Sequence, residues 1–434
     1  MIDARLRAAL ALGLLIGIAA FLSTDRKRIA WRLVAWGVGL QVVFALLVLR
    51  TPQGAAIFDV LDGVVHSVLG YGNEASAFVF GNLVQNEVPV GTLDESGGFV
   101  DSGETFARPG AFFAFRILPN IIFVSALMTV LYHVGFMQRV VWGVAWVMRR
   151  TMKTSGAETL CTASNIFVGM MESPLVVKPY VERMTTSELM AIMTAGLATI
   201  SANVLAAYAG MLSDVAPGAT THLIAASVMS APAALVVAKI LVPETEVPET
   251  TELVEDAVER PDVNIIDAAA RGASEGLRLA LLVGAMIIAF LALVAMFNGA
   301  IGWVGGWFGQ PDVTLQGLLG AAFRPVAWML GIPWTDAALI GQMIGVDLVL
   351  NEFVAYVQLT DALVAGAAIE PRSVVIGIYA LTTFANFGSV AMTIAGIGAI
   401  APSRRPELAT LGMKALLAGL MASLMTAAIA GVLV

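Results

Sequence analysis

The sequence NIFVGMMESP occupies residues 165–174 and is followed by KPY at residues 178–180. Between residues 160 and 177 it carries one charge, Glu172, close to Gly169 and Pro174. Irregular backbone at membrane depth survives only inside protein or facing a water-filled cavity, so this short and interrupted stretch predicts a hairpin that turns back within the bilayer. An ionisable group there costs about 2.5–3.5 kcal/mol, which makes Glu172 a candidate functional group with a partner.

Composition places this hairpin in an all-α polytopic membrane protein. Of 434 residues, 58% are hydrophobic and 13% are charged, and the charges separate apolar runs that can cross about 30 Å of hydrocarbon. The net charge of −8 comes largely from one acidic stretch, so it does not indicate a nucleic-acid partner. The single cysteine, Cys161, excludes an internal disulfide and a multi-cysteine metal site.

Eight spanning helices are predicted, and their orientation follows from the basic loops. They cover residues 8–22, 33–49, 117–132, 189–212, 223–238, 279–297, 374–400 and 415–434. The first is followed by Arg26, Lys27, Arg28 and Arg32, which favour the cytoplasmic side and place both termini in the periplasm. Residues 139–153 alternate basic and apolar side chains, as is typical of a helix lying at the membrane surface.

Three further segments are expected outside the hydrocarbon. Residues 51–108 have an acidic, turn-rich tip at residues 94–98 and should lie on the periplasmic side. Residues 243–262 carry eight acidic side chains and should form a solvated linker. Residues 302–334 are rich in tryptophan, which favours the outer interface.

The second half of the chain repeats the order of the first. Residues 340–356 carry Asp347, Asn351 and Glu352 and predict a second hairpin, and FANFGS at residues 384–389 predicts an unwound helix. Thr199, Ser201 and Asn203 interrupt the corresponding helix of the first half. Hairpins and broken helices in inverted repeats are typical of secondary transporters. The expected organisation is scaffold helices at 1–50, a periplasmic, scaffold and interfacial segment at 51–155, the first transport half at 156–242, a linker and scaffold segment at 243–335, and the second transport half at 336–434.

At these stretches the chain resembles the concentrative nucleoside transporter family. The matching segments are residues 165–174 with 178–180, 194–208, 349–356 (VLNEFVAY) and 384–389, and the similarity extends from about residue 80 to the last helix. The resemblance implies eight spanning helices plus two re-entrant hairpins, an elevator-type movement of a transport unit against a scaffold, and a homotrimer. It also implies import of nucleosides coupled to sodium, in a bacterial inner membrane.

The resemblance implies two sites. The sodium site would comprise Asn165, Val168, Thr199 and Ile200, the second and fourth through main-chain carbonyls. Sodium is a hard cation that takes oxygen ligands, which such residues supply without burying another carboxylate. In the nucleoside site, the ribose set would comprise Glu352, Asn386 and Ser389, with Phe384 in the same pocket. The positions facing the base would be Met170, Met171, Val204 and Glu172, the last also approaching the sugar.

The pair Met170-Met171 departs from many relatives, which have Gln-Thr before the hairpin glutamate. Thioethers replace two hydrogen-bonding groups that can read a pyrimidine edge. Methionine at the first position resembles purine-selective members, so we expect a preference for purine nucleosides.

Several alternatives remain open from the sequence. Glu172 and Glu352 can instead form a structural ion pair or a buried hydrogen bond between helices, small polar residues commonly join membrane helices, and the two methionines can serve as ordinary packing. The coupling ion can be a proton carried by Glu172 or Glu352. A membrane-embedded enzyme using paired carboxylates is the alternative from another class. The sequence GASEG at residues 272–276 matches a nucleophile elbow, but it precedes a spanning helix rather than following a strand, so we interpret it as a chance match.

Overall fold

The computed structural model describes residues 3–85, 88–93, 96, 99–107, 113–213, 215–250 and 262–434. The described chain is almost entirely helical, as the sequence predicts. Two predicted features lie largely outside the described residues: the acidic tip at residues 94–98, and the part of the acidic linker at residues 251–261 that contains Glu252, Glu255, Asp256 and Glu259.

Among the described residues, eight helical segments are long and apolar enough to cross a membrane. They are Ala4–Phe21, Trp31–Arg50, Pro52–Val84, Phe113–His133, Thr186–Leu212, Ala219–Leu241, Ile265–Gly306 and Pro402–Leu433. The number agrees with the prediction, but one member differs. A helix occupies Pro52–Phe80, which we expected outside the hydrocarbon, because its charges are sparse enough to leave an apolar window. The predicted span at 374–400 is divided by its break into two shorter helices.

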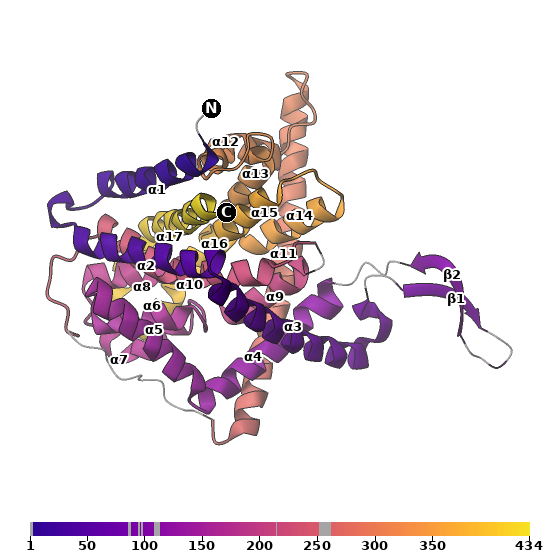
Figure 1. The fold of residues 1–434 in the computed structure, drawn as a ribbon, viewed down its shortest axis with the longest axis horizontal. Helices are drawn as coiled ribbons and strands as arrows, with labels where there is room; N and C mark the ends of the chain where they lie inside the picture. Colours follow the sequence, from indigo (N-terminus) through magenta and orange to yellow (C-terminus); the bar gives the residue numbers. More distant parts are fainter. Residues whose placement is uncertain are drawn as a thin grey trace.

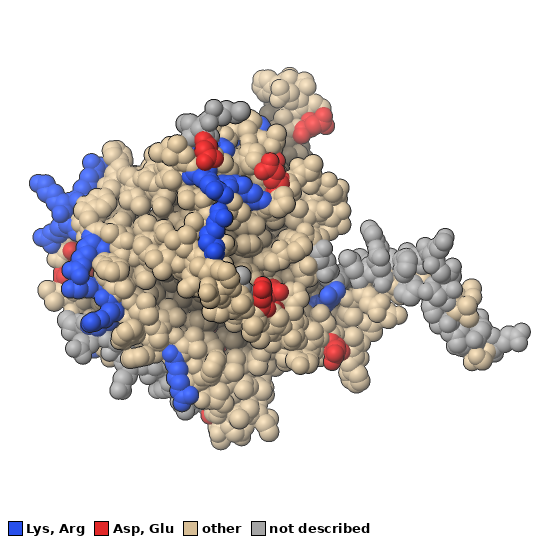
Figure 2. Space-filling model, viewed as in Figure 1, with Lys and Arg blue, Asp and Glu red and all other residues tan. Residues whose placement is uncertain are grey.

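The N-terminal region consists of three helices joined by short connections. Helix α1 (Ala4–Phe21) connects through a 3-10 turn (Arg26–Arg28) to α2 (Trp31–Arg50), which is followed by α3 (Pro52–Phe80) and a further 3-10 turn (Gly81–Val84). Strands β1 (Val88–Leu93) and β2 (Phe99–Ala107) pair antiparallel and project away from the helices (Figure 1). Lys and Arg gather at the edge of the molecule where the connection from α1 to α2 lies (Figure 2). Most of the rest of the face seen in Figure 2 carries no charged side chains.

A π-helical turn (Phe113–Ile117) leads into α4 (Leu118–His133), which packs against α11 (Ile265–Gly306), the longest helix in Figure 1. Two glycines permit the close approach. A Cβ added to Gly272 or Gly276 would come within 2.8 or 2.7 Å of the α4 backbone, so only glycine fits there. The nucleophile-elbow match at these glycines is therefore a helix-packing pattern. Helix α5 (Phe136–Met152) buries one face and exposes the other, as expected for residues 139–153.

The first hairpin and its broken helix form the interior of the first half. The hairpin consists of α6 (Gly156–Asn165), a 3-10 turn (Ser173–Val177) and α7 (Lys178–Val181). Helices α8 (Thr186–Ala198) and α9 (Ala202–Leu212) are separated by three residues outside helices, and α10 (Ala219–Leu241) follows. Serine or threonine capping boxes begin both α6 and α8, which defines where the hairpin and the broken helix start.

The second half has the same order of elements. After α12 (Leu315–Met329), the second hairpin consists of α13 (Ala337–Val349) and α14 (Glu352–Val364). The broken helix follows as α15 (Pro371–Leu381) and α16 (Phe387–Ile400). A 3-10 turn (Pro402–Arg404) leads to α17 (Arg405–Leu433), which packs against α1, α8, α10 and α15.

Burial separates a central unit from its surroundings. For each candidate span, burial is compared over its most apolar 18 residues. In α8–α9 and in α10, 89% of these residues are buried, and in the final helix 78% are. In α1, α3 and α11 the buried share is only 17–22%. The outer helices instead expose large apolar side chains such as Leu10, Val64 and Ile288. Apolar surface of this kind is stable when it faces lipid, which supports a multi-pass membrane protein.

Candidate functional site

The two broken helices meet at their breaks. The main-chain carbonyl of Leu197, near the end of α8, accepts hydrogen bonds from the Phe384 main-chain nitrogen at 2.8 Å and the Thr383 hydroxyl at 2.7 Å. An α-helix leaves its last carbonyls without helical partners, and here the break of the other half satisfies one of them. This junction brings the polar residues of both halves to the centre of the buried unit.

The predicted sodium ligands lie together beside this junction. The Asn165 side-chain amide donates to the Thr199 hydroxyl at 2.5 Å and to the Ala195 carbonyl at 2.6 Å. The side-chain Oδ1 of Asn165 accepts a hydrogen bond from the Ser173 hydroxyl at 3.1 Å. Asn165 is fully buried, so one side chain connects the end of α6, the hairpin turn and the end of α8.

The other two predicted ligands would act through main-chain carbonyls, and both residues lie outside helices. Val168 lies in the turn after α6, and Ile200 lies in the break between α8 and α9. The Ile200 carbonyl accepts from the Ser227 hydroxyl at 3.3 Å, and Ala202 donates its main-chain N–H to the Phe167 carbonyl at 3.1 Å. The hairpin turn is therefore docked on the break. The resulting cluster offers neutral oxygens from amide, hydroxyl and carbonyl groups, which suits a hard monovalent cation.

The second hairpin supplies the predicted ribose-binding residues. Glu352 begins α14 and accepts from the Tyr208 hydroxyl through Oε1 and from the Asn386 amide through Oε2, each at 3.0 Å. Asn386 caps α16, and its Oδ1 accepts from the Ser389 main-chain nitrogen at 2.8 Å. Glu352, Asn386 and Ser389 thus form one buried cluster, and Phe384 is buried in the same break. The glutamate is held by hydrogen bonds between helices, as one of the alternatives supposed.

The residues predicted to face the base divide into buried and exposed ones. Met170 is buried, and the Thr393 hydroxyl donates to its sulfur at 3.4 Å. It also packs closely on Gly196 of α8, where an added Cβ would lie 2.9 Å from the Met170 Cβ. Met171 is 41% exposed and packs beside Gly396 of α16. The methionines therefore fill the space between the hairpin turn, α8 and α16. Val204, on α9, is buried.

Glu172 lies in the turn of the first hairpin. Its side chain is exposed rather than buried, and its Oε2 lies beside Gly169, which adopts a φ of 107° that favours glycine. An exposed carboxylate in the hairpin turn is compatible with the predicted position facing a ligand, which stays a prediction. An accessible carboxylate can reach a ligand without first breaking an internal ion pair.

Sequence reasoning missed Tyr208, which contacts the predicted site directly. Its hydroxyl binds Glu352, and its ring stacks on that of Tyr356 with centroids 4.3 Å apart. One signal was present, because Tyr208 lies four residues after Val204 and therefore on the same face of α9. Ser227 and Thr393 were also missed, since each reaches the site from a distant helix.

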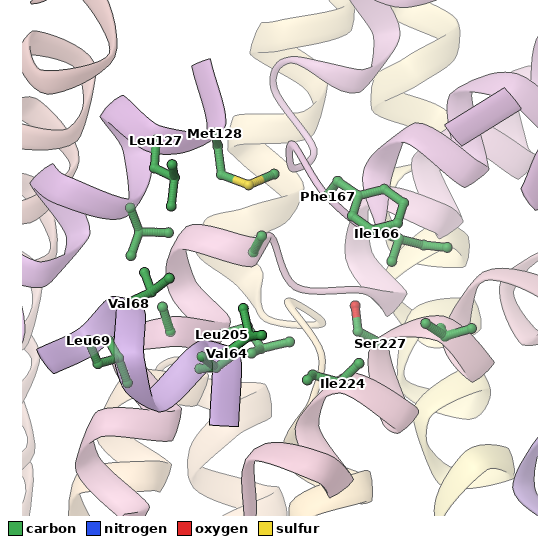
Figure 3. A pocket seen from close by; sticks show the side chains of 15 residues that line it. Val64, Val68, Leu69, Leu127, Met128, Ile166, Phe167, Leu205, Ile224 and Ser227 are labelled. Carbon is green, nitrogen blue, oxygen red and sulfur yellow. The ribbon is translucent and has the colours of Figure 1, made fainter. Parts of the chain in front are cut away.

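An apolar cavity of about 220 Å³ lies beside the predicted sodium ligands but apart from the predicted ribose-binding residues. Its lining comes from α3, α4, the first hairpin, α9 and α10 (Figure 3). Phe167 and Ile166 form one side, and Met128, Leu127 and Val68 lie opposite. The one polar side chain in the lining is Ser227, so this cavity offers a ribose almost no hydrogen-bonding partners.

Two hairpins and two broken helices that meet at their breaks define a secondary membrane transporter of the elevator type. Three protein-family models match the chain. The model of the Na+ dependent nucleoside transporter N-terminus matches residues 10–83, and that of its C-terminus matches residues 222–431. A model described as nucleoside recognition matches residues 114–215. The chain belongs to the concentrative nucleoside transporter family. Since its relatives are transporters, the enzyme alternative is not supported.

Individual relatives match over most of this chain. An uncharacterized transporter of Haemophilus influenzae is 42% identical over 432 residues, which cover 99% of this chain and 98% of that protein. The putative nucleoside permease NupX of Escherichia coli is 36% identical, and the match covers 98% of this chain and 98% of that protein. Solute carrier family 28 member 3 of Mus musculus is 40% identical over 95% of this chain and 56% of its own length.

Solved structures of the transporter CNTnw are similar over the whole chain. Its inward-facing, substrate-bound state has 43% sequence identity and a TM-score of 0.87, covering 99% of this chain and 98% of that one. An outward-facing state of a CNTnw variant has a TM-score of 0.88 with 99% and 97% covered.

Proposed function

We propose that this protein imports nucleosides by symport with sodium ions. One observation carries the proposal: a carboxylate with hydrogen-bond donors from both halves lies in the same buried unit as a cluster of neutral oxygens, and the two broken helices are joined between them. Such a unit binds a polyhydroxylated solute at one break and a cation at the other, so that both are carried by one movement. The proposal is supported by the family's sodium-dependent description.

Glu352, Asn386 and Ser389 would bind the ribose. An ionised carboxylate accepts at about four lone-pair positions, and Tyr208 and Asn386 occupy two of them, which leaves two for ribose hydroxyls. A nucleoside lacking one hydroxyl would leave a buried acceptor unpaired, at a cost of about 1–3 kcal/mol. Phe384 lies at the same break and would pack against the sugar or base.

Asn165, Val168, Thr199 and Ile200 would hold sodium. The Asn165 amide directs its nitrogen to Thr199 and its oxygen to Ser173. When sodium binds, the amide oxygen would turn to the ion and the Thr199 hydroxyl would offer a lone pair to it. The Ile200 carbonyl accepts from the Ser227 hydroxyl through one lone pair and would offer the other to the ion as the fourth ligand.

Met170, Met171, Glu172 and Val204 would face the base, with a preference for purines. The thioethers present polarizable surface without fixed donors, which suits the larger apolar area of a purine ring. Exposed Met171 is the member of the pair that a base can reach without displacing a packed side chain.

Uptake of radiolabelled adenosine into proteoliposomes tests the proposal. Wild-type protein should take up adenosine when sodium is present outside, and Glu352→Gln should lose at least about tenfold, because a charge-assisted hydrogen bond contributes about 1.5–3 kcal/mol. Glu370→Gln, at an exposed glutamate outside the cluster, is the matched control and should behave as wild type. Full uptake by Glu352→Gln would exclude the assigned ribose site.

Proton coupling is a second candidate, favoured by one side chain. Asp347 in α13 is 1% exposed, and its Oδ1 has no hydrogen-bond partner. A carboxylate in such surroundings is stable when it is neutral or pairs with a cation, which describes a proton carrier. Replacing sodium by choline at constant pH separates the two: a sodium symporter loses uptake, and a proton symporter keeps it and depends on Asp347.

The protein would act as a homotrimer in a bacterial inner membrane, with both termini in the periplasm. The transport unit would comprise residues 156–242 and 336–434, and the scaffold would comprise residues 1–50, 51–155 and 243–335. The contrast in burial between the central and outer helices supports this division. Cross-linking of the purified protein and labelling of cysteines introduced near each terminus test these assignments.

A further inference from the structure

Tyr208 contributes the only contact by which the first half of the described chain holds the Glu352 carboxylate. Its hydroxyl donates to Oε1, and Asn386 of the second half donates to Oε2. Tyr208 is fully buried, so its hydroxyl has no water to turn to. The direction of the carboxylate is consequently set by one hydrogen-bond donor from each half of the chain. Tyr208 lies 144 residues from Glu352 in sequence, and Asn386 lies 34 residues from it.

The ring of Tyr208 is fixed against the second hairpin. It stacks on Tyr356, with centroids 4.3 Å apart and planes 25° apart, and meets the edge of Phe353 at 4.8 Å. Both partners belong to α14, which also carries Glu352. A flip of the ring about its own axis does not move the hydroxyl, and packing against Tyr356 and Phe353 restricts the other side-chain motions. A displacement of α9 therefore changes the hydrogen bond directly.

Helix α9 begins at the oxygen cluster. The break at residues 199–201 contains Thr199 and Ile200, and the first residue of α9, Ala202, is bonded to the hairpin turn at Phe167. Tyr208 lies six residues further on, which is about 9 Å along a rigid helix. A rearrangement of the break around a cation thus reaches the Glu352 carboxylate through one short helix.

We propose that Tyr208 is a positioning residue that couples cation binding at the α8–α9 break to the affinity of the Glu352 site for ribose. The inference rests on the proposed function and adds the route by which sodium affects nucleoside binding. Sodium draws together the residues of the break, α9 takes its bound position, and the Tyr208 hydroxyl holds Oε1. The remaining lone pairs of Glu352 then point to the ribose hydroxyls. Without the cation the carboxylate is less well directed, and nucleoside binds more weakly.

The test measures adenosine binding to the purified full-length protein by calorimetry, in sodium and in choline. In wild type we expect sodium to tighten adenosine binding. Tyr208→Phe removes one oxygen and keeps the packed ring, so it should weaken binding in sodium about tenfold and leave binding in choline nearly unchanged. The matched control is Tyr356→Phe, whose hydroxyl contacts the Ile378 carbonyl at 3.2 Å and Thr382 at 3.1 Å instead of a carboxylate. It should keep the wild-type sodium effect.

Two further readouts separate positioning from a general structural role. The loss of affinity for 3′-deoxyadenosine relative to adenosine should shrink in Tyr208→Phe and stay unchanged in Tyr356→Phe. The rise in melting temperature caused by sodium alone should persist in Tyr208→Phe, because the oxygen cluster is intact. Loss of that rise would place the defect in the cation site and overturn the inference.

The outcomes distinguish the inference from the function on which it rests. Wild-type protein that binds adenosine equally in sodium and in choline would overturn both. Sodium-dependent binding in wild type that Tyr208→Phe fully retains would overturn the inference and leave the symport proposal standing.

Discussion

The Thr383 hydroxyl, in the break between α15 and α16, donates a hydrogen bond to the Leu197 carbonyl at the end of α8. This contact joins the interruptions of two helices that belong to different halves of the chain. Because each interruption carries one set of predicted ligands, the bond holds the cation cluster and the ribose cluster in one rigid unit. Under the proposed symport, rigidity at this point would allow both ligands to be carried across the membrane together.

Thr383→Val should lower both stability and transport. The substitution keeps the shape of the side chain and removes one buried hydrogen bond, at a cost of about 1 kcal/mol, while Phe384 still donates to Leu197. Thermal unfolding and the maximal rate of adenosine uptake measure the two effects. Thr410→Val, at an exposed threonine bonded to the Pro406 carbonyl, is the matched control and should change neither. Equal effects of the two substitutions would contradict a special role for the junction.

Asn165→Ala should raise the sodium concentration that gives half-maximal uptake by at least about tenfold. The change removes a predicted ligand together with the amide donor to the Thr199 hydroxyl and the amide acceptor of the Ser173 hydroxyl. Uptake at varied sodium and saturating adenosine measures it. Ser164→Ala affects the neighbouring buried residue, whose hydroxyl has no hydrogen-bond partner, and should leave the sodium dependence unchanged. A normal sodium dependence in Asn165→Ala would remove this residue from the cation site.

Replacing both methionines by Met170→Gln and Met171→Thr should shift substrate preference toward uridine. Gln at position 170 lies within reach of the Thr393 hydroxyl, so its amide need not be unpaired, and it adds a group that reads a pyrimidine edge. Relative uptake of uridine and adenosine, each at low concentration, should change by about tenfold. Leu175→Gln, at an exposed residue of the same hairpin, serves as control. If wild type takes up uridine as well as adenosine, the purine preference is wrong.

Lys239→Met should cause a large loss of stability. The Lys239 ammonium contacts Glu158 at 2.7 Å, Ser187 at 3.0 Å and Glu244 at 3.2 Å, and Glu158 is 1% exposed. Removing the lysine leaves a buried carboxylate uncompensated, at a cost of about 3–5 kcal/mol.

The control is a double substitution. Lys239→Met combined with Glu158→Gln removes the unpaired charge and should recover part of the loss in thermal unfolding. For comparison, Glu275→Gln breaks an exposed pair with Arg271 and should cost about 1 kcal/mol or less. Equal stability of the single and double variants would contradict a buried ion pair.

The parts of the site that sequence predicted best are those with local causes. Asn386 and Asn351 were recognised as polar residues that interrupt apolar runs, and each begins a helix by accepting a main-chain N–H through its own side chain. Glycine, proline and asparagine in a run that is otherwise apolar favour unwinding wherever it lies in the fold. Both hairpins and both breaks therefore follow from a few residues each.

The parts that sequence did not predict depend on contacts between distant segments. In the sequence, Tyr208 resembles any residue on the apolar face of a helix. Only the packing of α9 on α14 places its hydroxyl within hydrogen-bond distance of the Glu352 carboxylate. Ser227 reaches the Ile200 carbonyl from α10 in the same way. The helix at Pro52–Phe80 was missed because Asp59, Asp62 and Glu74 mask an apolar window of modest hydropathy.

The most direct test is accumulation of adenosine against its own gradient. Proteoliposomes with equal adenosine on both sides receive an inward sodium gradient at constant pH and zero membrane potential. The account predicts that wild-type protein concentrates adenosine inside, that dissipating the gradient with a sodium ionophore releases it, and that Glu352→Gln does neither. Equilibration without accumulation, or accumulation that persists when choline replaces sodium, would contradict sodium-coupled nucleoside transport.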